Sequence, residues 1–154
     1  MHPDISRLPS RVFYKGLLKD GLCMAEKTAR PWHKSNLFGP YKFFNVPHGQ
    51  ESSRLSAAHS LINLAEVEVA IALYARLLTD FDPVNLSVGV ISMYRDQVLM
   101  LRCKFESRFG SDVTQHIDFN TVDGFQGQEK DIIILSCVRA DPSLENVGFL
   151  SGTF

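Results

Sequence analysis

The sequence predicts an α/β domain with a mostly parallel sheet flanked by helices. Two compact apolar runs, residues 88–92 and 132–138, are typical of buried strands. Two longer stretches, residues 64–78 and 94–109, repeat apolar side chains every three or four positions, which is typical of helices. Because these strands and helices alternate along the chain, parallel strand pairing through crossover helices is expected.

Size and composition place the chain in the globular class. It has 154 residues, of which 45% are hydrophobic and 21% charged, so a disordered or fibrous class is excluded. This length predicts one domain or part of one. No apolar run approaches the ~18 residues of a membrane span, and the N-terminus has no signal pattern, so we expect neither a membrane partner nor secretion. Three widely spaced cysteines indicate a reducing compartment.

Residues 1–40 predict a lead-in segment and loop. Pro9 and Gly16 interrupt the apolar residues near the start, so only a short helical turn or two is expected, followed by a polar loop held by Trp32 and Phe38. Basic residues outnumber acidic ones eight to three up to Lys42. This bias suits either a face for a polyanion or an ordinary solvated surface.

The middle of the chain predicts a strand, a loop and a helix. Residues 41–46 form a short β-rich run before a proline, and residues 48–60 are a polar loop. Asn63 is a candidate N-cap, and Glu66 stands three residues later, as in a capping box. The helix over 64–78 is expected to bury one face and to end at residues 81–83. That face would contain Val69, Leu73 and Leu77.

The second half predicts the rest of the sheet. A buried parallel strand over 88–92 precedes a helix over 94–109, and Gly110 sits where a C-terminal cap belongs. Residues 117–122 alternate apolar and polar side chains, as a short strand does. The isoleucine-rich run 132–138 is the most strongly β-forming segment, and we expect it to be a central strand.

The loop between the last two predicted strands is the richest in chemistry. It lies where an open α/β sheet places its binding crevices. Its glycines permit close backbone approaches, and its hydroxyl, amide and carboxylate groups match several ligand types. A plain polar turn explains the same residues equally well. The candidate residues are Thr121, Gly124, Gln126, Gly127 and Glu129.

A second candidate is the junction at residues 92–97, where a strand gives way to a helix. Backbone N–H groups at a helix start attract phosphate, and Tyr94 and Arg95 suit stacking or pairing with a polyanion. Alternatively, Ser92 caps the helix and Arg95 is solvated. The five histidines share no metal-ligand spacing with one another or with the cysteines, so we predict no metal site.

These segments resemble the superfamily 1 helicases of the senataxin and nonsense-mediated-decay branch. Residues 88–97 resemble the strand and helix start called motif IV. Residues 118–139, with the core NTVDGFQGQEKDIIILSCVR, resemble motif V and the strand after it. Residues 1–14 resemble the segment that follows Gln-Tyr-Arg in these enzymes, and residues 147–150 resemble the lead-in to motif VI.

The resemblance implies a RecA-like fold of the P-loop NTPase type. Such helicases hold ATP and Mg²⁺ in a cleft between two RecA-like domains, bind single-stranded RNA or DNA across both, and move 5′ to 3′. This chain resembles the second domain, so its partners would be a first RecA-like domain and a single strand, in the nucleus or the cytoplasm. By motif, the nucleotide would be faced by Gln126, Gly127 and Glu129. Thr121 would contact the nucleic-acid backbone. Near the strand path or domain cleft would lie Tyr94, Arg95 and Gln97, with Asn63 and Glu66 structural.

The sequence also departs from the family pattern. It carries no G-x-x-x-x-G-K-S/T phosphate loop, it starts after the Gln-Tyr-Arg position, and it stops before motif VI; Met93 replaces a usual proline. We therefore expect residues 1–154 to be part of a second RecA-like domain, without tight ATP or Mg²⁺ binding or hydrolysis alone. The alternative is a non-catalytic fragment that binds single-stranded nucleic acid or regulates a helicase.

Overall fold

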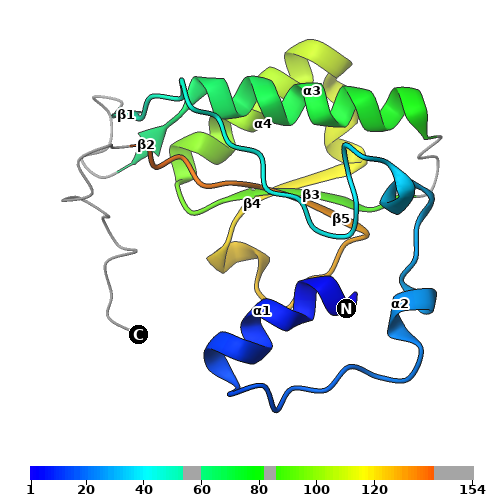
Figure 1. Ribbon diagram of the computed structural model, residues 1–154. Coiled ribbons are helices and arrows are strands. Elements are labelled where there is room, and N and C mark those ends of the chain that lie inside the picture. Colours follow the sequence, from blue (N-terminus) through cyan, green and yellow to red (C-terminus); the bar gives the residue numbers. More distant parts are fainter. Residues whose placement is uncertain (54–59, 82–85, 141–154) are drawn as a thin grey trace. The chain divides into compact units, whose positions relative to one another are not determined.

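The computed structural model describes residues 1–53, 60–81 and 86–140 (Figure 1). They belong to two compact units, Met1–Asn45 and Val46–Phe154. The predicted helix end at residues 82–83 and the resemblance at residues 147–150 lie outside the described residues. No helix within the described ranges is long and apolar enough to cross a membrane.

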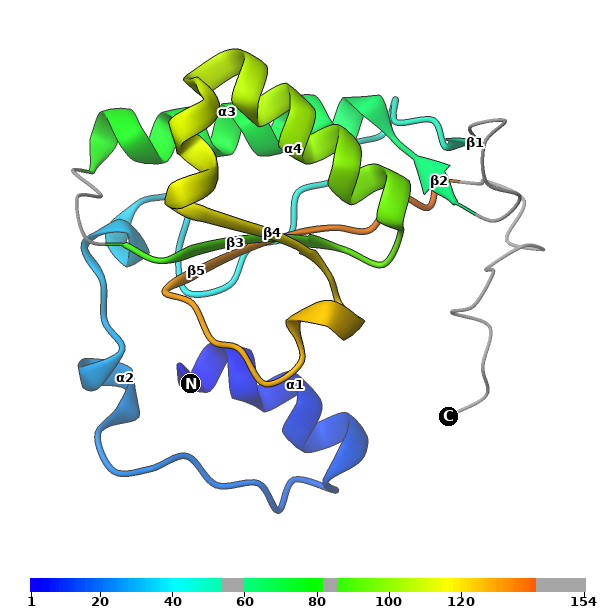
Figure 2. The same cartoon turned by 180° about the vertical axis from the view of Figure 1, so that it is seen from behind.

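The second unit is built on a three-stranded parallel sheet. Its strands are β3 (Val88–Ser92), β4 (Ile117–Thr121) and β5 (Ile132–Ser136), in the order β4-β3-β5. Helices α3 (Leu64–Asp80) and α4 (Arg95–Phe109) lie side by side on one face of this sheet (Figures 1 and 2). The predicted α/β class and the parallel pairing are confirmed.

The position of β5 corrects one prediction. We expected the isoleucine-rich run to be a central strand, but β5 lies at an edge of the described sheet, and β3, almost entirely buried, lies between the other two described strands. In β5, burial alternates, and the side chains of Ile133 and Leu135 are 44% and 49% exposed. The error arises because an apolar run shows that a strand prefers burial, whereas its place in the sheet depends on which partners reach it.

The two long helices are where the sequence predicts them. Gly110 ends α4 with φ at +91°, in the region that favours glycine. The buried face of α3 differs from the prediction: Leu77 is buried as expected, but Val69 and Leu73 are only partly buried. The residues that face the core are Val67, Ala70, Tyr74 and Leu77. The four-residue spacing therefore found the helix, but the buried face follows steps of three and four residues and is rotated from the predicted face.

An aromatic cluster joins both helices to the sheet. Phe105 of α4 is fully buried, and its ring centroid lies 5.6 Å from that of Tyr74 on α3 and 5.3 Å from that of Phe119 on β4. Phe109 adds an edge-on contact to Tyr74 at 5.1 Å. Tilted and edge-to-face arrangements of this kind are favourable for aromatic pairs. The cluster thus fixes the height of both helices above the strands.

The strand predicted over residues 41–46 is wrong. The backbone there is irregular, no described strand pairs with it, and the Phe43 side chain is 76% exposed. A β-rich composition without an available partner does not make a strand. Instead, two-residue strands form within and after the predicted polar loop. β1 (Ser52–Ser53) pairs antiparallel with β2 (Leu61–Ile62), while residues 54–59 lie outside the described residues.

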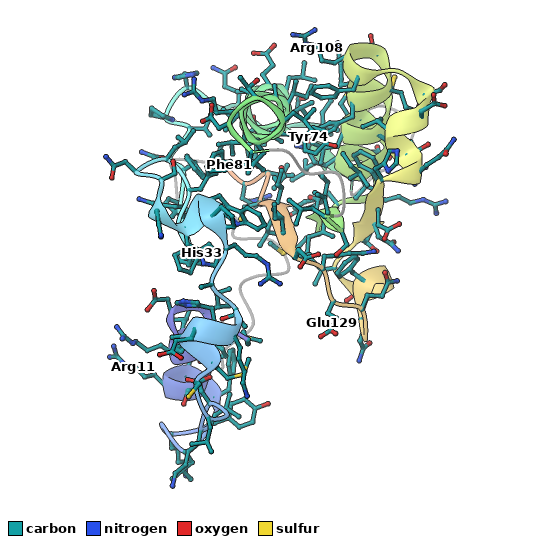
Figure 3. All side chains as sticks on the ribbon, turned by 90° about the vertical axis from the view of Figure 1, so that its right-hand side faces the viewer. Arg11, His33, Tyr74, Phe81, Arg108 and Glu129 are labelled. Carbon is teal, nitrogen blue, oxygen red and sulfur yellow. The ribbon has the colours of Figure 1, made fainter. Side chains whose placement is uncertain are left out.

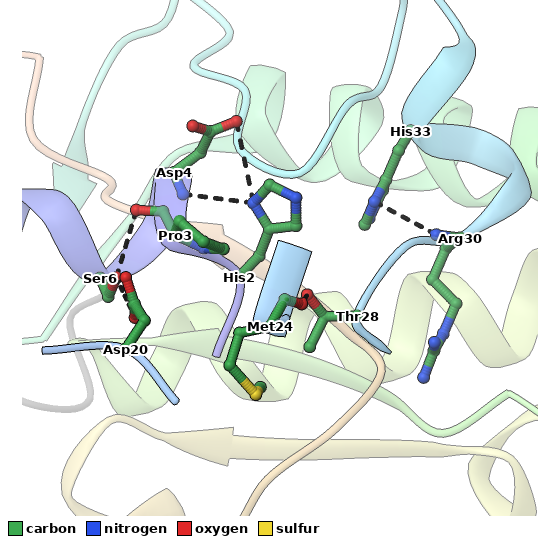
Figure 4. Close-up of polar contacts among 9 residues, drawn as sticks. All are labelled: His2, Pro3, Asp4, Ser6, Asp20, Met24, Thr28, Arg30 and His33. Atoms are coloured by element: carbon green, nitrogen blue, oxygen red, sulfur yellow. Dashed lines mark hydrogen bonds and ion pairs between the residues drawn. The ribbon is translucent and has the colours of Figure 1, made fainter. Parts of the chain in front are cut away.

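The first unit contains α1 (Pro3–Phe13), the single-turn helix α2 (Met24–Lys27) and a 3₁₀ turn at Pro31–Lys34. The helix α1 is longer than the predicted turn or two and contains Pro9. Figure 4 shows polar contacts within this first unit. The Ser6 hydroxyl donates to Asp20 at 2.7 Å, and the Arg30 N–H donates to His33 Nδ1 at 3.3 Å. Trp32 is buried, as is Phe38.

Candidate functional site at the carboxyl edge of the sheet

The three parallel strands end in a row of hydroxyl side chains. Ser92, the last residue of β3, is in register with Thr121 at the end of β4 and with Ser136 at the end of β5. The carboxyl edge of an open parallel sheet is where α/β proteins bind ligands. The segments that leave this edge are the start of α4, the loop from 122 to 131, and residues 137–140. They contain every site residue that the sequence predicts, except Thr121 itself.

Gln97 occupies the buried centre of this edge. Its side chain is 0% exposed, and its Oε1 accepts a 2.9 Å hydrogen bond from the backbone N–H of Asn63. Its Nε2 donates to the Asn63 carbonyl at 3.1 Å and to the Ser136 hydroxyl oxygen at 2.9 Å. Because the Gln97 side chain is buried and already hydrogen-bonded at both its oxygen and its nitrogen, it can affect a ligand only by positioning other residues. The structure therefore separates Gln97 from the other predicted site residues.

Asn63 and Glu66 form the N-cap contact of α3 and also form hydrogen bonds to residues distant in the sequence. The N-cap is confirmed, because Asn63 Oδ1 accepts from the Glu66 N–H at 3.3 Å. The reciprocal half of a capping box is not formed, since the Asn63 N–H is taken by Gln97. Glu66 instead accepts from the Ser136 hydroxyl at 2.5 Å and from the Val138 N–H at 3.0 Å. Local spacing found the pair, but not these partners 70 and 72 residues away.

The backbone after β5 is held in a strained turn. Val138 is fully buried with φ at +71°, a conformation that costs energy for a β-branched residue. The Arg139 N–H donates across it to the Cys137 carbonyl at 2.8 Å, which closes a three-residue turn. The amide of Asn63 donates to the Val138 carbonyl at 3.1 Å. Glu66 and Asn63 thus satisfy both backbone groups of Val138 and hold the turn in place.

A second acidic residue anchors the end of the same segment. Glu51 accepts from the Ala140 N–H at 2.9 Å and pairs with the Arg139 guanidinium at 3.2 Å, and both side chains are mostly buried. No sequence pattern singled out Glu51 or Arg139. The only signal available was the position of Arg139 at the end of the motif V resemblance.

The reactivity of the Cys137 thiol depends on this network, because Cys137 lies between Ser136 and Val138 and near Glu66. Partial burial of its thiol, and then the nearby Glu66 carboxylate, raise the pKa of Cys137. A raised pKa means less thiolate at neutral pH, so we expect slow alkylation by iodoacetamide. In a chain with Cys23→Ser and Cys103→Ser, Glu66→Gln is expected to speed the alkylation severalfold at pH 7, measured by mass spectrometry. Glu68→Gln on the exposed face of α3 is the control, and equal rates in the two variants would contradict the assignment.

The loop after β4 is organised around Thr121. The Thr121 hydroxyl oxygen accepts from the Gly124 N–H at 3.2 Å, while the Asn120 amide donates to the Gly124 carbonyl at 3.0 Å. The Asn120 Oδ1 also accepts from the Thr121 N–H at 2.9 Å. A Cβ atom at Gly124 would lie within 3 Å of the Asn120 side chain, so any larger residue there would require Asn120 to move away from its contact with the Gly124 carbonyl. This local folding presents the Thr121 hydroxyl in a defined orientation.

Gln126, Gly127 and Glu129 stand exposed at the far end of that loop. Gly127 has φ at +80° with open space around it. Glu129 makes no hydrogen bond or ion pair with any residue in the described ranges, and Figure 3 shows it in the loop, away from α3 and α4 of the same unit. An amide, an open backbone and a free carboxylate fit a nucleotide, whose ribose hydroxyls and phosphates need acceptors and donors. Their assignment to a nucleotide stays a prediction.

Two predicted nucleic-acid residues meet in a surface pocket. A pocket of about 380 Å³ lies between α4 and β4, and Arg95 and Thr121 both line it. The exposed Arg95 and the half-buried Tyr94 stand at the start of α4, where the Tyr94 N–H donates to the Ser92 hydroxyl oxygen at 3.3 Å. Tyr94 does not line the pocket. The remaining lining residues are Val98, Leu99, Arg102, Phe119 and Asn120.

A parallel α/β sheet with polar residues along its carboxyl edge is typical of ligand-binding α/β domains, and comparison with known proteins identifies the family. The AAA domain family matches residues 1–153. The chain is 46% identical to Helicase SEN1 of Saccharomyces cerevisiae, with 97% of the chain aligned, and 43% identical to Probable helicase MAGATAMA 3 of Arabidopsis thaliana, with 99% aligned. It is 34% identical to a Regulator of nonsense transcripts 1 homolog of Drosophila melanogaster, with 98% aligned.

The chain therefore belongs to the superfamily 1 helicases of the senataxin and nonsense-mediated-decay branch. The resemblance predicted from motifs IV and V is confirmed. The aligned region spans 7% of Helicase SEN1, 19% of MAGATAMA 3 and 13% of the Drosophila protein. Full-length helicases of this family use ATP and Mg²⁺ and act on nucleic acid.

Proposed function

We propose that this chain supplies part of an ATP-dependent 5′-to-3′ helicase, as part of a second RecA-like domain. In this role it provides one side of an ATP site and one stretch of a single-strand path. The observation that carries the proposal is the shared pocket of Thr121 and Arg95, which come from β4 and α4 and meet at the ligand-binding edge of the sheet. A first RecA-like domain is the proposed partner, and the family resemblance favours the nucleus as the place of action.

On the nucleotide side, the proposed contacts are Gln126, Gly127 and Glu129. Phosphoryl transfer depends on positioned charge, which a lysine-bearing phosphate loop, Mg²⁺ and arginine side chains supply in such enzymes. The sequence has no such phosphate loop, so this loop would orient a nucleotide that the first domain holds. Its exposed carboxylate and amide are free to do so.

On the strand side, the Thr121 hydroxyl and the Arg95 guanidinium would bind the sugar–phosphate backbone, and Tyr94 would lie beside it. Backbone contacts carry most of the affinity for nucleic acid without reading sequence. Gln97 serves this side indirectly, because it holds Asn63 and Ser136 in the same carboxyl edge. The path would therefore rest on a rigid part of the fold.

A chimaera tests the proposal. Residues 1–153 of this chain would replace the aligned region of Helicase SEN1, and strand-stimulated ATP hydrolysis and unwinding would be measured. We expect an active chimaera in which Glu129→Gln lowers the rate of hydrolysis by at least about tenfold, equivalent to the loss of one charged contact. Arg95→Ala should weaken strand binding.

The matched control is Glu68→Gln, which removes an exposed carboxylate from α3. It should leave both activities unchanged. A folded chimaera that neither hydrolyses ATP nor unwinds, or an active one that ignores Glu129→Gln, would refute the assignment.

The second candidate function is binding of single-stranded nucleic acid by this chain alone. It is favoured by one observation: the pocket that contains Arg95 and Thr121 is formed entirely within the second unit, and its lining has no acidic side chain. Salt-sensitive binding by the isolated 154-residue chain, without any ATP hydrolysis, would support it.

A further inference from the structure

Arg102 lies on the same face of α4 as Arg95. The two residues are seven positions apart, two helical turns, with Leu99 between them, and all three line the pocket. The guanidinium carbon of Arg102 lies 5.4 Å from the centre of the Phe119 ring, and its Nη2 donates to the Phe119 carbonyl at 3.4 Å. These contacts order a long side chain before any ligand arrives, which lowers the entropy cost of binding.

The pocket holds uncompensated positive charge. Arg76, Lys130 and Arg139 each pair with a carboxylate. Within the described ranges, Arg95 and Arg102 have no such partner, and the pocket lining contains no acidic side chain. Arginine suits a phosphate because its planar fork presents several donors at once. The remaining N–H groups of Arg102 are available for this.

Thr121 adds a directed donor to the same pocket. Its oxygen already accepts a hydrogen bond from Gly124, so the hydroxyl proton is left for a ligand. The side chains of Val98 and Leu99 form an apolar wall beside these donors, and Leu99 is 53% exposed. A phosphate oxygen flanked by an apolar surface is the chemistry of one nucleotide unit in a single strand, whose sugar and base are not buried in a duplex stack.

We propose that the pocket between α4 and β4 binds a backbone phosphate of single-stranded nucleic acid, and that Arg102 is a second phosphate-binding residue beside Arg95. This rests on the proposed strand-binding function and extends it along α4. The phosphate would sit between the two guanidinium groups and the Thr121 hydroxyl, with the adjoining sugar or base on Val98 and Leu99.

The test measures binding of the 154-residue chain to a fluorescein-labelled oligouridylate of about 12 nucleotides by fluorescence anisotropy. Arg102→Gln is expected to weaken binding about tenfold at low salt, the loss of one charged hydrogen-bonding group. Between about 50 and 200 mM salt, the slope of log affinity against log salt should become shallower by about 0.7, equivalent to one phosphate. Arg102→Lys should recover part of the affinity, because it keeps the charge without the fork.

Arg108→Gln is the matched control. Arg108 is also exposed on α4 and also lies over a ring, 5.9 Å from the centre of Phe109, but it stands near the opposite end of the unit from Glu129 and does not line the pocket (Figure 3). Its substitution should change neither the affinity nor the slope. Circular dichroism would confirm that each variant is folded.

The outcomes separate the two proposals. If Arg95→Ala weakens binding and Arg102→Gln acts like Arg108→Gln, the inference about Arg102 fails while strand binding stands. If the unaltered chain binds no oligouridylate even at low salt, strand binding by this chain fails, and the inference fails with it. If polyglutamate of matched charge displaces the labelled oligouridylate as well as unlabelled oligouridylate does, the pocket recognises negative charge alone, and the assignment to nucleic acid is overturned.

Discussion

Gln97→Leu is expected to lower the free energy of unfolding of the second unit by about 3 kcal/mol. Leucine fills nearly the same volume but offers no hydrogen bonds, so the buried N–H and carbonyl of Asn63 and the Ser136 hydroxyl lose a partner. Each orphaned buried group costs about 1–3 kcal/mol, and the loss of the Asn63 N–H acceptor is the largest part. Urea unfolding followed by far-UV circular dichroism measures this loss.

The control for Gln97→Leu is Lys104→Leu, the same new side chain at an exposed position of the same helix. It should stay within about 0.5 kcal/mol of the unaltered chain. If both variants unfold at the same urea concentration, the network around Gln97 contributes nothing to stability. The Gln97→Leu variant should also alkylate faster at Cys137, because Ser136 and the turn at Val138 lose a support.

Phe105→Ala is expected to cost about 4 kcal/mol, the largest effect of any single change considered. The ring is fully buried, and its removal leaves a cavity between α3, α4 and β4 that the neighbouring rings fill only in part. Because these rings set the height of α4 above the sheet, the positions of Arg95 and Arg102 over β4 should loosen as well. Urea unfolding gives the energy, and oligouridylate binding gives the loss of affinity.

Leu99→Ala on the same helix provides the comparison. Leu99 is about half exposed, so its truncation should cost less than about 1 kcal/mol of stability while removing part of the apolar wall of the pocket. A stability loss for Phe105→Ala no larger than that for Leu99→Ala would mean that the aromatic cluster does not hold the unit together.

Hydrophobic spacing predicted the long helices and the three parallel strands, because a helix or a buried strand must repeat apolar residues with its own period. The same reasoning failed for residues 41–46, where the sequence has β-forming side chains but no described strand pairs with them. It also placed β5 in the centre of the sheet. Both errors concern strand pairing, because the strands that are available as neighbours come from segments far away in the sequence.

The candidate site divides in the same way. Motifs in the sequence found Thr121, Arg95 and the loop with Glu129, because glycines and polar groups between strands are a local pattern. They did not separate Gln97, which the fold buries, from Arg95, which it exposes. Nor did they find Arg102, because its proposed role depends on its contact with Phe119 and on the pocket that it shares with Thr121, and both of those residues are on β4.

Periodicity and local patterns along the chain were enough to predict the α/β class, the helicase family and the segments that carry the motifs. The contacts of Glu66 and Asn63 with the turn at Val138, and the pocket shared by Arg95, Arg102 and Thr121, emerge only in the folded chain. This is because hydrogen bonds and pockets join side chains that parallel register and helix packing bring together. No spacing along the chain specifies which distant side chains those will be.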